Sequence, residues 1–383
     1  MFLFCSESFG HRLHRRRKYA SLSVDYGSIP PMSILKLEPI FKPRTIRYYG
    51  GKAKLADFII NCLQQSGLKE GMTVLDGFTG TSVVAQELKH RGYHTYANDH
   101  LYFCYALADA HLAFNHRPNF KKLKLNSGVI DYLNSLAPKN GFVTRNYSPF
   151  EKCERMYLSI ENANKVDAIR DQLEEWKNEE TISISEFNYL LAALIYSINL
   201  VSNITGTYGA YLKFWESRSK NSLVLAPIDI SSSKYPNQAM CKDVVEAVSQ
   251  RHYDFIYLDP PYNSRGYFSN YFFLEIVAKG WYETVPIPQG ITGIPRNLEI
   301  RSDYSSRVEV GGAFQRLINK CDAEHVAISY NNEGLLPQQK LLEILSDFGK
   351  VKLFTQEHKR YRSINQDGTN SITQELLFVV RKK

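Results

Sequence analysis

The chain has 383 residues, enough to bury a full hydrophobic core as one large domain or two smaller ones. Hydrophobic residues make up 44% and charged residues 22%, which argues against disorder over most of the length, and the formal charge of +8 suits a polyanionic partner such as nucleic acid. The six cysteines form no CxxC pair, so neither a zinc cluster nor a disulfide framework is indicated, and the longest apolar stretch, 190–201, is too short and too polar to span a bilayer.

Residues 1–43 differ in composition from the rest. A basic run at 11–18 is followed by Ser- and Pro-containing sequence, without the apolar segment of a secretory signal. Three interpretations stay open: an organelle presequence, translation that begins at Met32, and a flexible basic extension. We expect the last of these.

The next segment predicts one βαβ unit. Residues 53–64 carry apolar side chains at helical spacing. Residues 73–75 form a short apolar strand that ends in Asp76, residues 83–91 a helix closed by Gly92, and residues 93–97 a second strand. Strand, glycine turn, helix and strand is the order of a parallel βαβ unit.

Two long helices are predicted in the middle of the chain. Apolar residues recur every three or four positions from Met156 to Trp176, and again from Phe187 to Ile198, where Ser185 is the expected N-cap. We assign both apolar stripes to the core. Residues 203–213, rich in Gly, Thr and Tyr, are expected to form a loop.

The last third of the chain predicts further strands. Residues 253–258 are apolar and stop at Asp259, residues 326–330 form another strand, and a helix is expected near 337–348. Residues 351–354 and 375–380 are expected to close the chain as an antiparallel hairpin around a basic loop at 358–362. The order of elements predicts an α/β fold with a largely parallel sheet that is covered on both faces.

The turn at 76–82 has the features of a nucleotide-like cofactor site. Its glycines let the backbone approach a ligand, and the helix that follows offers free N–H groups. Asp99 ends the next strand and can accept hydrogen bonds from both ribose hydroxyls of an adenosine-containing cofactor. The alternative is a turn that only satisfies geometry and an Asp that caps a helix. Gly77 and Gly80 are separated by two residues rather than one, which counts against a dinucleotide site of the G-x-G-x-x-G type.

The tetrapeptide Asp-Pro-Pro-Tyr at 259–262 is the most informative motif. The amino nitrogen of adenine is a poor nucleophile because its lone pair is delocalised into the ring. The Asp259 carboxylate and the Pro260 carbonyl can each accept one N–H bond and so free that lone pair for attack on a sulfonium methyl. Tyr262 offers an aromatic face to a flipped-out base. The alternative is a turn that only ends the strand.

Three motifs in this order resemble the D12 class of amino-methyltransferases, which includes the Dam-type N6-adenine DNA methyltransferases. Residues 48–52 are similar to the family's N-terminal cofactor motif, 76–82 to its cofactor loop, and 259–262 to its catalytic tetrapeptide. The resemblance implies an α/β, Rossmann-like S-adenosylmethionine-dependent methyltransferase core with an inserted, mostly helical target-recognition domain. The core would comprise 44–125 and 250–383, the insertion 126–249, and the flexible basic extension 1–43.

Residues and resemblance together assign candidate roles. The cofactor S-adenosyl-L-methionine, without a metal, would be bound by Tyr48, Lys52, Asp76, Phe78, Gly80, Asp99 and Asp259. Catalysis would fall to Asp259, Pro260 and Tyr262. Double-stranded DNA would contact Tyr208, Lys213, Lys359, Arg360 and Arg362. A solvated basic surface remains an equally good interpretation of each Lys and Arg.

We therefore expect a site-specific DNA methyltransferase that acts on N6 of a flipped-out adenine, as the modification enzyme of a restriction–modification system. A cognate restriction endonuclease need not contact it, and we expect a cytoplasmic monomer of bacterial or phage origin without membrane contact. Three other planar amines stay open as substrates, namely cytosine N4, RNA adenine and protein glutamine. A DNA-binding relative without catalysis also stays open, whereas a dinucleotide oxidoreductase would leave Asp259 unexplained.

Overall fold

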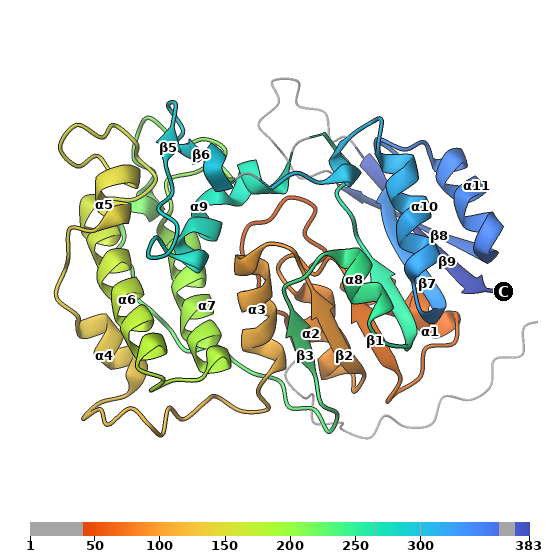
Figure 1. Ribbon diagram of the computed structural model, residues 1–383, viewed down its shortest axis with the longest axis horizontal. Coiled ribbons are helices and arrows are strands. Elements are labelled where there is room, and N and C mark those ends of the chain that lie inside the picture. Colours follow the sequence, from red (N-terminus) through yellow and green to blue (C-terminus); the bar gives the residue numbers. More distant parts are fainter. Residues whose placement is uncertain (1–40, 265, 299, 360–371) are drawn as a thin grey trace, which may run out of the picture. The chain divides into compact units, whose positions relative to one another are not determined.

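A seven-stranded sheet forms the centre of the computed structural model, which describes residues 41–264, 266–298, 300–359 and 372–383 (Figure 1). The strand order is β3-β2-β1-β4-β7-β9-β8. The strands are β1 (Thr73–Asp76), β2 (His94–Asn98), β3 (Gln238–Met240), β4 (Tyr253–Leu258), β7 (Ala323–Asn331), β8 (Gly349–Lys359) and β9 (Ile372–Lys382). The first five in spatial order run parallel, and β9 is antiparallel to both β7 and β8, which confirms the predicted terminal hairpin.

Helices cover both faces of the sheet because its strands are apolar on both faces. On β1, Val74 packs with α1 (Ala56–Gln65) and α2 (Val83–His90), whereas Leu75 packs against the opposite layer. That opposite layer contains α8 (Val244–Ser249), α10 (Val310–Lys320) and α11 (Gln338–Phe348). The predicted α/β fold with a largely parallel, doubly covered sheet is therefore confirmed.

A second apolar core lies in a helical part beyond the β3 edge of the sheet (Figure 1). It is built from α3 (Tyr102–Leu112), α4 (Val129–Ser135), α5 (Phe142–Tyr147), α6 (Ile160–Asn178), α7 (Ile184–Val201) and α9 (Tyr267–Lys279). A small hairpin of β5 (Pro288–Gln289) and β6 (Ile294–Pro295) contacts α9. Both helices predicted for the middle of the chain are present as α6 and α7.

One predicted helix start differs from the structure. The N-cap of α7 is Ser183 rather than Ser185, because Ser183 and Glu186 form a reciprocal capping box. Within the stretch 126–249 that is predicted as the insertion, β3 pairs with β2 in the central sheet and α8 packs on that sheet. Conversely, α9 lies in a segment predicted as core but packs against α3 and α7 in the helical part.

Helix α7 is strongly apolar. Among the described residues it alone is long and apolar enough to cross a membrane, yet 78% of its span is buried within the protein. Its neighbours are α3, α6 and α9. The apolar stripe is thus accounted for by the core of the helical part.

Candidate active site

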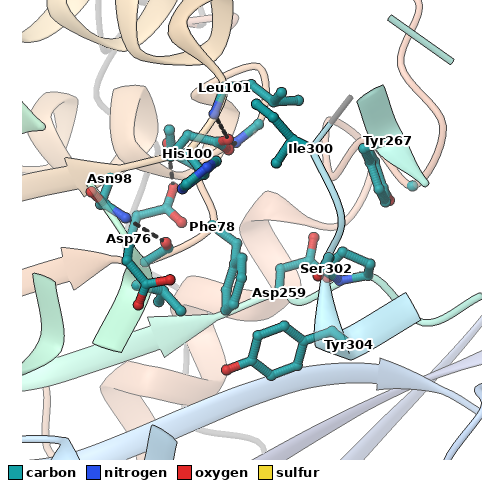
Figure 2. Close-up of a pocket in the computed structure, with 18 of the residues that line it drawn as sticks. Asp76, Phe78, Asn98, His100, Leu101, Asp259, Tyr267, Ile300, Ser302 and Tyr304 are labelled. Carbon is teal, nitrogen blue, oxygen red and sulfur yellow. Dashed lines mark hydrogen bonds between the residues drawn. The ribbon is translucent and has the colours of Figure 1, made fainter. Parts of the chain in front are cut away.

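Three aspartates gather where neighbouring parallel strands end. Asp76 ends β1, Asp99 follows β2, and Asp259 follows β4. Parallel strands present their carboxyl ends at one edge of a sheet, so the chain brings the three carboxylates to one place. A cavity of about 400 Å³ opens there, within the size range of small-molecule sites (Figure 2).

All seven residues predicted to bind the cofactor line this cavity. They are Tyr48, Lys52, Asp76, Phe78, Gly80, Asp99 and Asp259. Of the predicted catalytic residues, only Asp259 is in the lining. Pro260 is buried and Tyr262 is partly buried immediately beyond it. The structure therefore brings the predicted cofactor-binding residues and the predicted catalytic tetrapeptide together at Asp259.

The glycine turn after β1 is fastened to both neighbouring strands. The Gly77 N–H donates to the Tyr257 carbonyl of β4 at 2.8 Å, and the Thr79 N–H donates to the Asn98 carbonyl of β2 at 2.9 Å. Gly80 has a φ of +52°, and a Cβ added there would lie 3.1 Å from the Tyr48 ring. A side chain at this position is thus disfavoured both by the backbone conformation and by the close approach of the Tyr48 ring.

The Asp76 and Asp99 carboxylates stabilise this turn by accepting hydrogen bonds from its residues. The Thr79 hydroxyl donates to Asp76 Oδ2 at 2.9 Å, and the backbone N–H groups of Gly80 and Leu101 donate to the two oxygens of Asp99 at 2.9 and 3.0 Å. Within the described part of the chain, Asp76 Oδ1 is buried and has no hydrogen-bond partner. A buried carboxylate oxygen that faces a cavity without a partner indicates a donor supplied by a ligand.

Burial controls the electrostatics of all three acids. It raises the pKa of Asp76 to about 8, an effect only partly opposed by the Thr79 hydrogen bond. It also raises the pKa of Asp99 to about 6, against the two backbone hydrogen bonds. The pKa of Asp259 likewise rises to about 6, because burial outweighs the adjacent Lys52. A positively charged ligand would favour the ionised form of each carboxyl.

Lys52 lies between the partly buried carboxylate of Asp259 and the buried carboxylate of Glu375. Its Nζ is 2.8 Å from Asp259 Oδ1 and 3.3 Å from Glu375 Oε1, and it also donates to the Gly50 carbonyl. Burial lowers the pKa of Lys52, but the carboxylates of Asp259 and Glu375 outweigh that effect and hold it well above its usual value. Lys52 is therefore a charged ammonium bound directly to the predicted catalytic acid.

Aromatic residues connect residues 48–52 with the Asp-Pro-Pro-Tyr tetrapeptide at 259–262. Tyr48 stacks on Tyr271 of α9 with 4.5 Å between ring centroids. Gly50 has a φ of +74°, and a Cβ there would lie 3.0 Å from the hydroxyls of both Tyr262 and Tyr267. Lys52 Nζ lies 5.8 Å from the centroid of the Tyr262 ring. These contacts bring residues 48–52 and 259–262 together on one side of the cavity, although the two segments are far apart in sequence.

The predicted DNA contacts have mixed outcomes. Tyr208 is fully buried, its hydroxyl lies 2.9 Å from that of Ser202, and its N–H donates to the Asn270 carbonyl. The prediction of Tyr208 as a surface contact is therefore wrong, because a loop rich in glycine and tyrosine folds its aromatic residue into the helical core. Lys213 is exposed on the same loop. The side chains of Lys359, Arg360 and Arg362 lie outside the described residues.

Sequence reasoning missed several residues around the cavity. Tyr267 at the start of α9 and Tyr304 from a 3-10 turn (Asp303–Ser305) line it, and Tyr304 packs edge-on against Phe78 with centroids 5.2 Å apart (Figure 2). Glu375, on β9, contacts Lys52. Only Glu375 carried a signal, as an acid that opens a strongly apolar strand. Among the described residues, no group of three or more His, Cys, Asp or Glu side chains could hold a metal ion.

Comparisons with known proteins point to one family. The model of the D12 class N6 adenine-specific DNA methyltransferases matches residues 48–335. Type II methyltransferase M.FokI of Planomicrobium okeanokoites is 36% identical over 346 residues, which cover 88% of this chain and 53% of M.FokI. Modification methylase StsI of Streptococcus sanguinis is 37% identical over 347 residues, 88% of this chain and 52% of StsI. The chain thus spans about half the length of these two relatives.

A third relative matches over nearly its whole length. Type II methyltransferase M.NlaIII of Neisseria lactamica is 31% identical over 343 residues, which cover 88% of this chain and 99% of M.NlaIII.

Proposed function

Because the chain belongs to the D12 class N6 adenine-specific DNA methyltransferase family, we propose that it transfers a methyl group from S-adenosylmethionine to N6 of a flipped-out adenine in double-stranded DNA. One observation carries the proposal. A single cavity holds both the glycine turn with its two acids and Asp259, the first residue of the amine-binding tetrapeptide. Methyl donor and target amine would therefore meet at Asp259.

The cavity residues fit S-adenosylmethionine. This cofactor carries an ammonium and a sulfonium. Five aspartates line the cavity, among them Asp76, Asp99 and Asp259, and Asp76 has an oxygen without a hydrogen-bond partner among the described residues. Gly80 leaves room beside the Tyr48 ring that a Cβ would fill. We assign Tyr48, Lys52, Asp76, Phe78, Gly80, Asp99 and Asp259 to this cofactor. When bound, it supplies an electrophilic methyl group on sulfur.

The chain's own residues would prepare the adenine amine. Asp259 accepts one N–H bond through its carboxylate, and Pro260 accepts the other through its carbonyl, so that the nitrogen lone pair is no longer delocalised into the ring. The two consecutive prolines fix the backbone that carries that carbonyl. Tyr262 offers a ring face for stacking. The Lys52 ammonium keeps Oδ1 of Asp259 occupied at 2.8 Å, which leaves Oδ2 for the amine.

Lys213, Lys359, Arg360 and Arg362 are proposed to neutralise DNA phosphates. Support for Lys213 comes from the loop at 203–216. Hydrogen bonds between Asn203 and residues Leu212 and Glu216 join the two ends of this loop. The Tyr208 N–H also donates to the Asn270 carbonyl of α9 at 2.7 Å. The same helix begins at Tyr267, which lines the cavity. The exposed lysine is thus carried by a loop attached to the cavity wall.

The biological setting is proposed from the relatives. M.FokI and M.NlaIII are named type II methyltransferases, and StsI a modification methylase. We propose a modification enzyme of a restriction–modification system, a cytoplasmic monomer of bacterial or viral origin, with a restriction endonuclease that need not contact it. The predicted division into a core at 44–125 and 250–383 and a target-recognition insertion also remains a proposal.

The proposal is tested by incubating the purified chain with unmethylated DNA and S-adenosylmethionine labelled in its methyl group, followed by nucleoside analysis. Label in N6-methyladenine supports the assignment. Label in N4-methylcytosine, or label only when RNA or protein is offered, would replace adenine in DNA with another planar amine.

A further inference from the structure

The buried acid Glu375 lies behind the ion pair of Lys52 and Asp259. Lys52 Nζ is 3.3 Å from Glu375 Oε1 and 2.8 Å from Asp259 Oδ1, so that one ammonium serves two carboxylates. The side chains of Lys52 and Glu375 are only 7% and 4% exposed. Water therefore screens this arrangement little, and the interactions within it are strong.

Glu375 is itself held in place. The Ser329 hydroxyl of β7 donates to Glu375 Oε1 at 2.9 Å, and Ser329 is fully buried. Both residues lie on paired central strands, Ser329 opposite Leu377 and Asn331 opposite Glu375. The acid is thus presented by rigid sheet rather than by a loop, and the apolar neighbours Leu376 and Leu377 do not account for a charge at this position.

We propose that Glu375 is a positioning residue that shares Lys52 with Asp259 and thereby keeps Asp259 a strong hydrogen-bond acceptor for the target amine. The inference rests on the proposed function, because it concerns the same site. Glu375 does not line the cavity, so it acts through Lys52 rather than on substrate.

The physical reason is competition for one cation. With Glu375 absent, the Lys52 charge would act on Asp259 alone and would lower its proton affinity and its strength as an acceptor. The other titratable groups that act on Asp259 come from the end of β1, from β4 and its following turn, and from the start of α9: Asp76, Tyr257, Tyr262 and Tyr267. Burial raises the pKa of each tyrosine, so all three stay neutral where Asp259 titrates.

The test compares Glu375→Gln, Glu375→Asp and a matched control in the full chain. Glu357→Gln is the control, because it makes the same chemical change at an exposed position on the neighbouring strand β8. Two properties are measured: the titration midpoint of the Asp259 carboxyl by ¹³C NMR, assigned with Asp259→Asn, and methyl transfer as a function of pH. The first readout does not depend on the substrate.

We expect Glu375→Gln to lower the Asp259 midpoint by roughly one pH unit and kcat by roughly tenfold, with KM for S-adenosylmethionine little changed. The acidic limb of the rate profile should move down with the midpoint. Glu375→Asp should retain most of the parental behaviour, and Glu357→Gln all of it.

A parental Asp259 midpoint in Glu375→Gln would overturn the inference, whatever the activity, since a purely structural role leaves that midpoint in place. If the parent chain methylates no adenine, the proposed function fails, and the NMR titration still decides whether Glu375 acts on Asp259.

Discussion

The Asp99 carboxylate accepts a hydrogen bond from the Gly80 N–H at 2.9 Å, so the acid that follows β2 closes the glycine turn that follows β1. The same carboxylate accepts the Leu101 N–H through its other oxygen. The turn and the acid therefore form one unit that is shaped before any ligand arrives. Such preorganisation reduces the entropy that binding must overcome.

Gly80→Ala should weaken cofactor binding. The added methyl group would lie 3.1 Å from the Tyr48 ring in a backbone conformation that disfavours any side chain, so the turn or the ring must move. We expect the dissociation constant of S-adenosylmethionine to rise by about tenfold or more, measured by isothermal titration calorimetry.

Gly311→Ala is the matched control for that change. Gly311 lies in α10, and an added Cβ would meet only Leu336 at 3.8 Å, an ordinary contact. The variant should bind the cofactor like the parent and be more stable by about 0.5–1 kcal/mol, because alanine favours a helix. Equal cofactor affinity in both alanine variants would contradict the assignment of the turn.

Cofactor binding should strengthen as pH rises from about 6 to about 8. Burial raises the pKa of Asp76 to about 8 and those of Asp99 and Asp259 to about 6 in the free chain. A cationic ligand favours the ionised carboxyls, so the complex binds fewer protons than the free chain, and its affinity increases with pH across this range. Calorimetry in buffers of different ionisation enthalpy should show protons released on binding.

Asp76→Asn should remove the upper part of this pH dependence, between about 6 and 8, since only Asp76 titrates there among the three acids. Asp347→Asn makes the same change at an exposed position on α11 and should leave the dependence intact. An Asp76→Asn variant with the full parental proton release would show that another group is responsible.

The sequence predicted the residues at the carboxyl ends of the parallel strands better than the other residues that surround the cavity. Asp76, Asp99 and Asp259 each follow an apolar strand, and parallel strands must end together, so their meeting was predictable. The family predicted from three motifs in order is confirmed by the family match over 48–335.

The remaining residues depend on long-range packing. Tyr304 reaches the cavity from a short 3-10 turn without local pattern. Glu375 reaches Lys52 from a strand whose register with β7 the sequence does not give. Tyr208 was misassigned because its loop composition is typical of a surface, whereas the neighbours that bury it, such as Tyr157 and Phe273, are distant in sequence.

Lys52→Met should destabilise the chain by about 3–5 kcal/mol, because it leaves the partly buried carboxylate of Asp259 and the buried carboxylate of Glu375 without a cation. The loss should grow with pH as the Asp259 carboxyl ionises. Adding Glu375→Gln should recover part of it. Lys54→Met, the same change at an exposed position, should cost less than about 0.5 kcal/mol in chemical denaturation. Equal losses in the two lysine variants would mean that the shared ion pair contributes nothing.

Lys213→Ala should reduce the dependence of DNA affinity on salt. If Lys213 neutralises one phosphate, the slope of log K against log salt falls by about one, for all DNA sequences alike. Lys340→Ala is the control, because Lys340 lies on α11 and pairs with Glu343 at 3.1 Å. An unchanged slope in Lys213→Ala would remove this residue from the DNA interface.

The most direct test of the central claim is methyl transfer to DNA at saturating S-adenosylmethionine by the parent, Asp259→Ala and Asp322→Ala. Asp322 is an exposed acid that pairs with His252, so its removal controls for the loss of a carboxylate. We expect N6-methyladenine from the parent and from Asp322→Ala, and a rate lower by about 10²–10⁴ in Asp259→Ala. Undiminished adenine methylation by Asp259→Ala would contradict the assignment of this site.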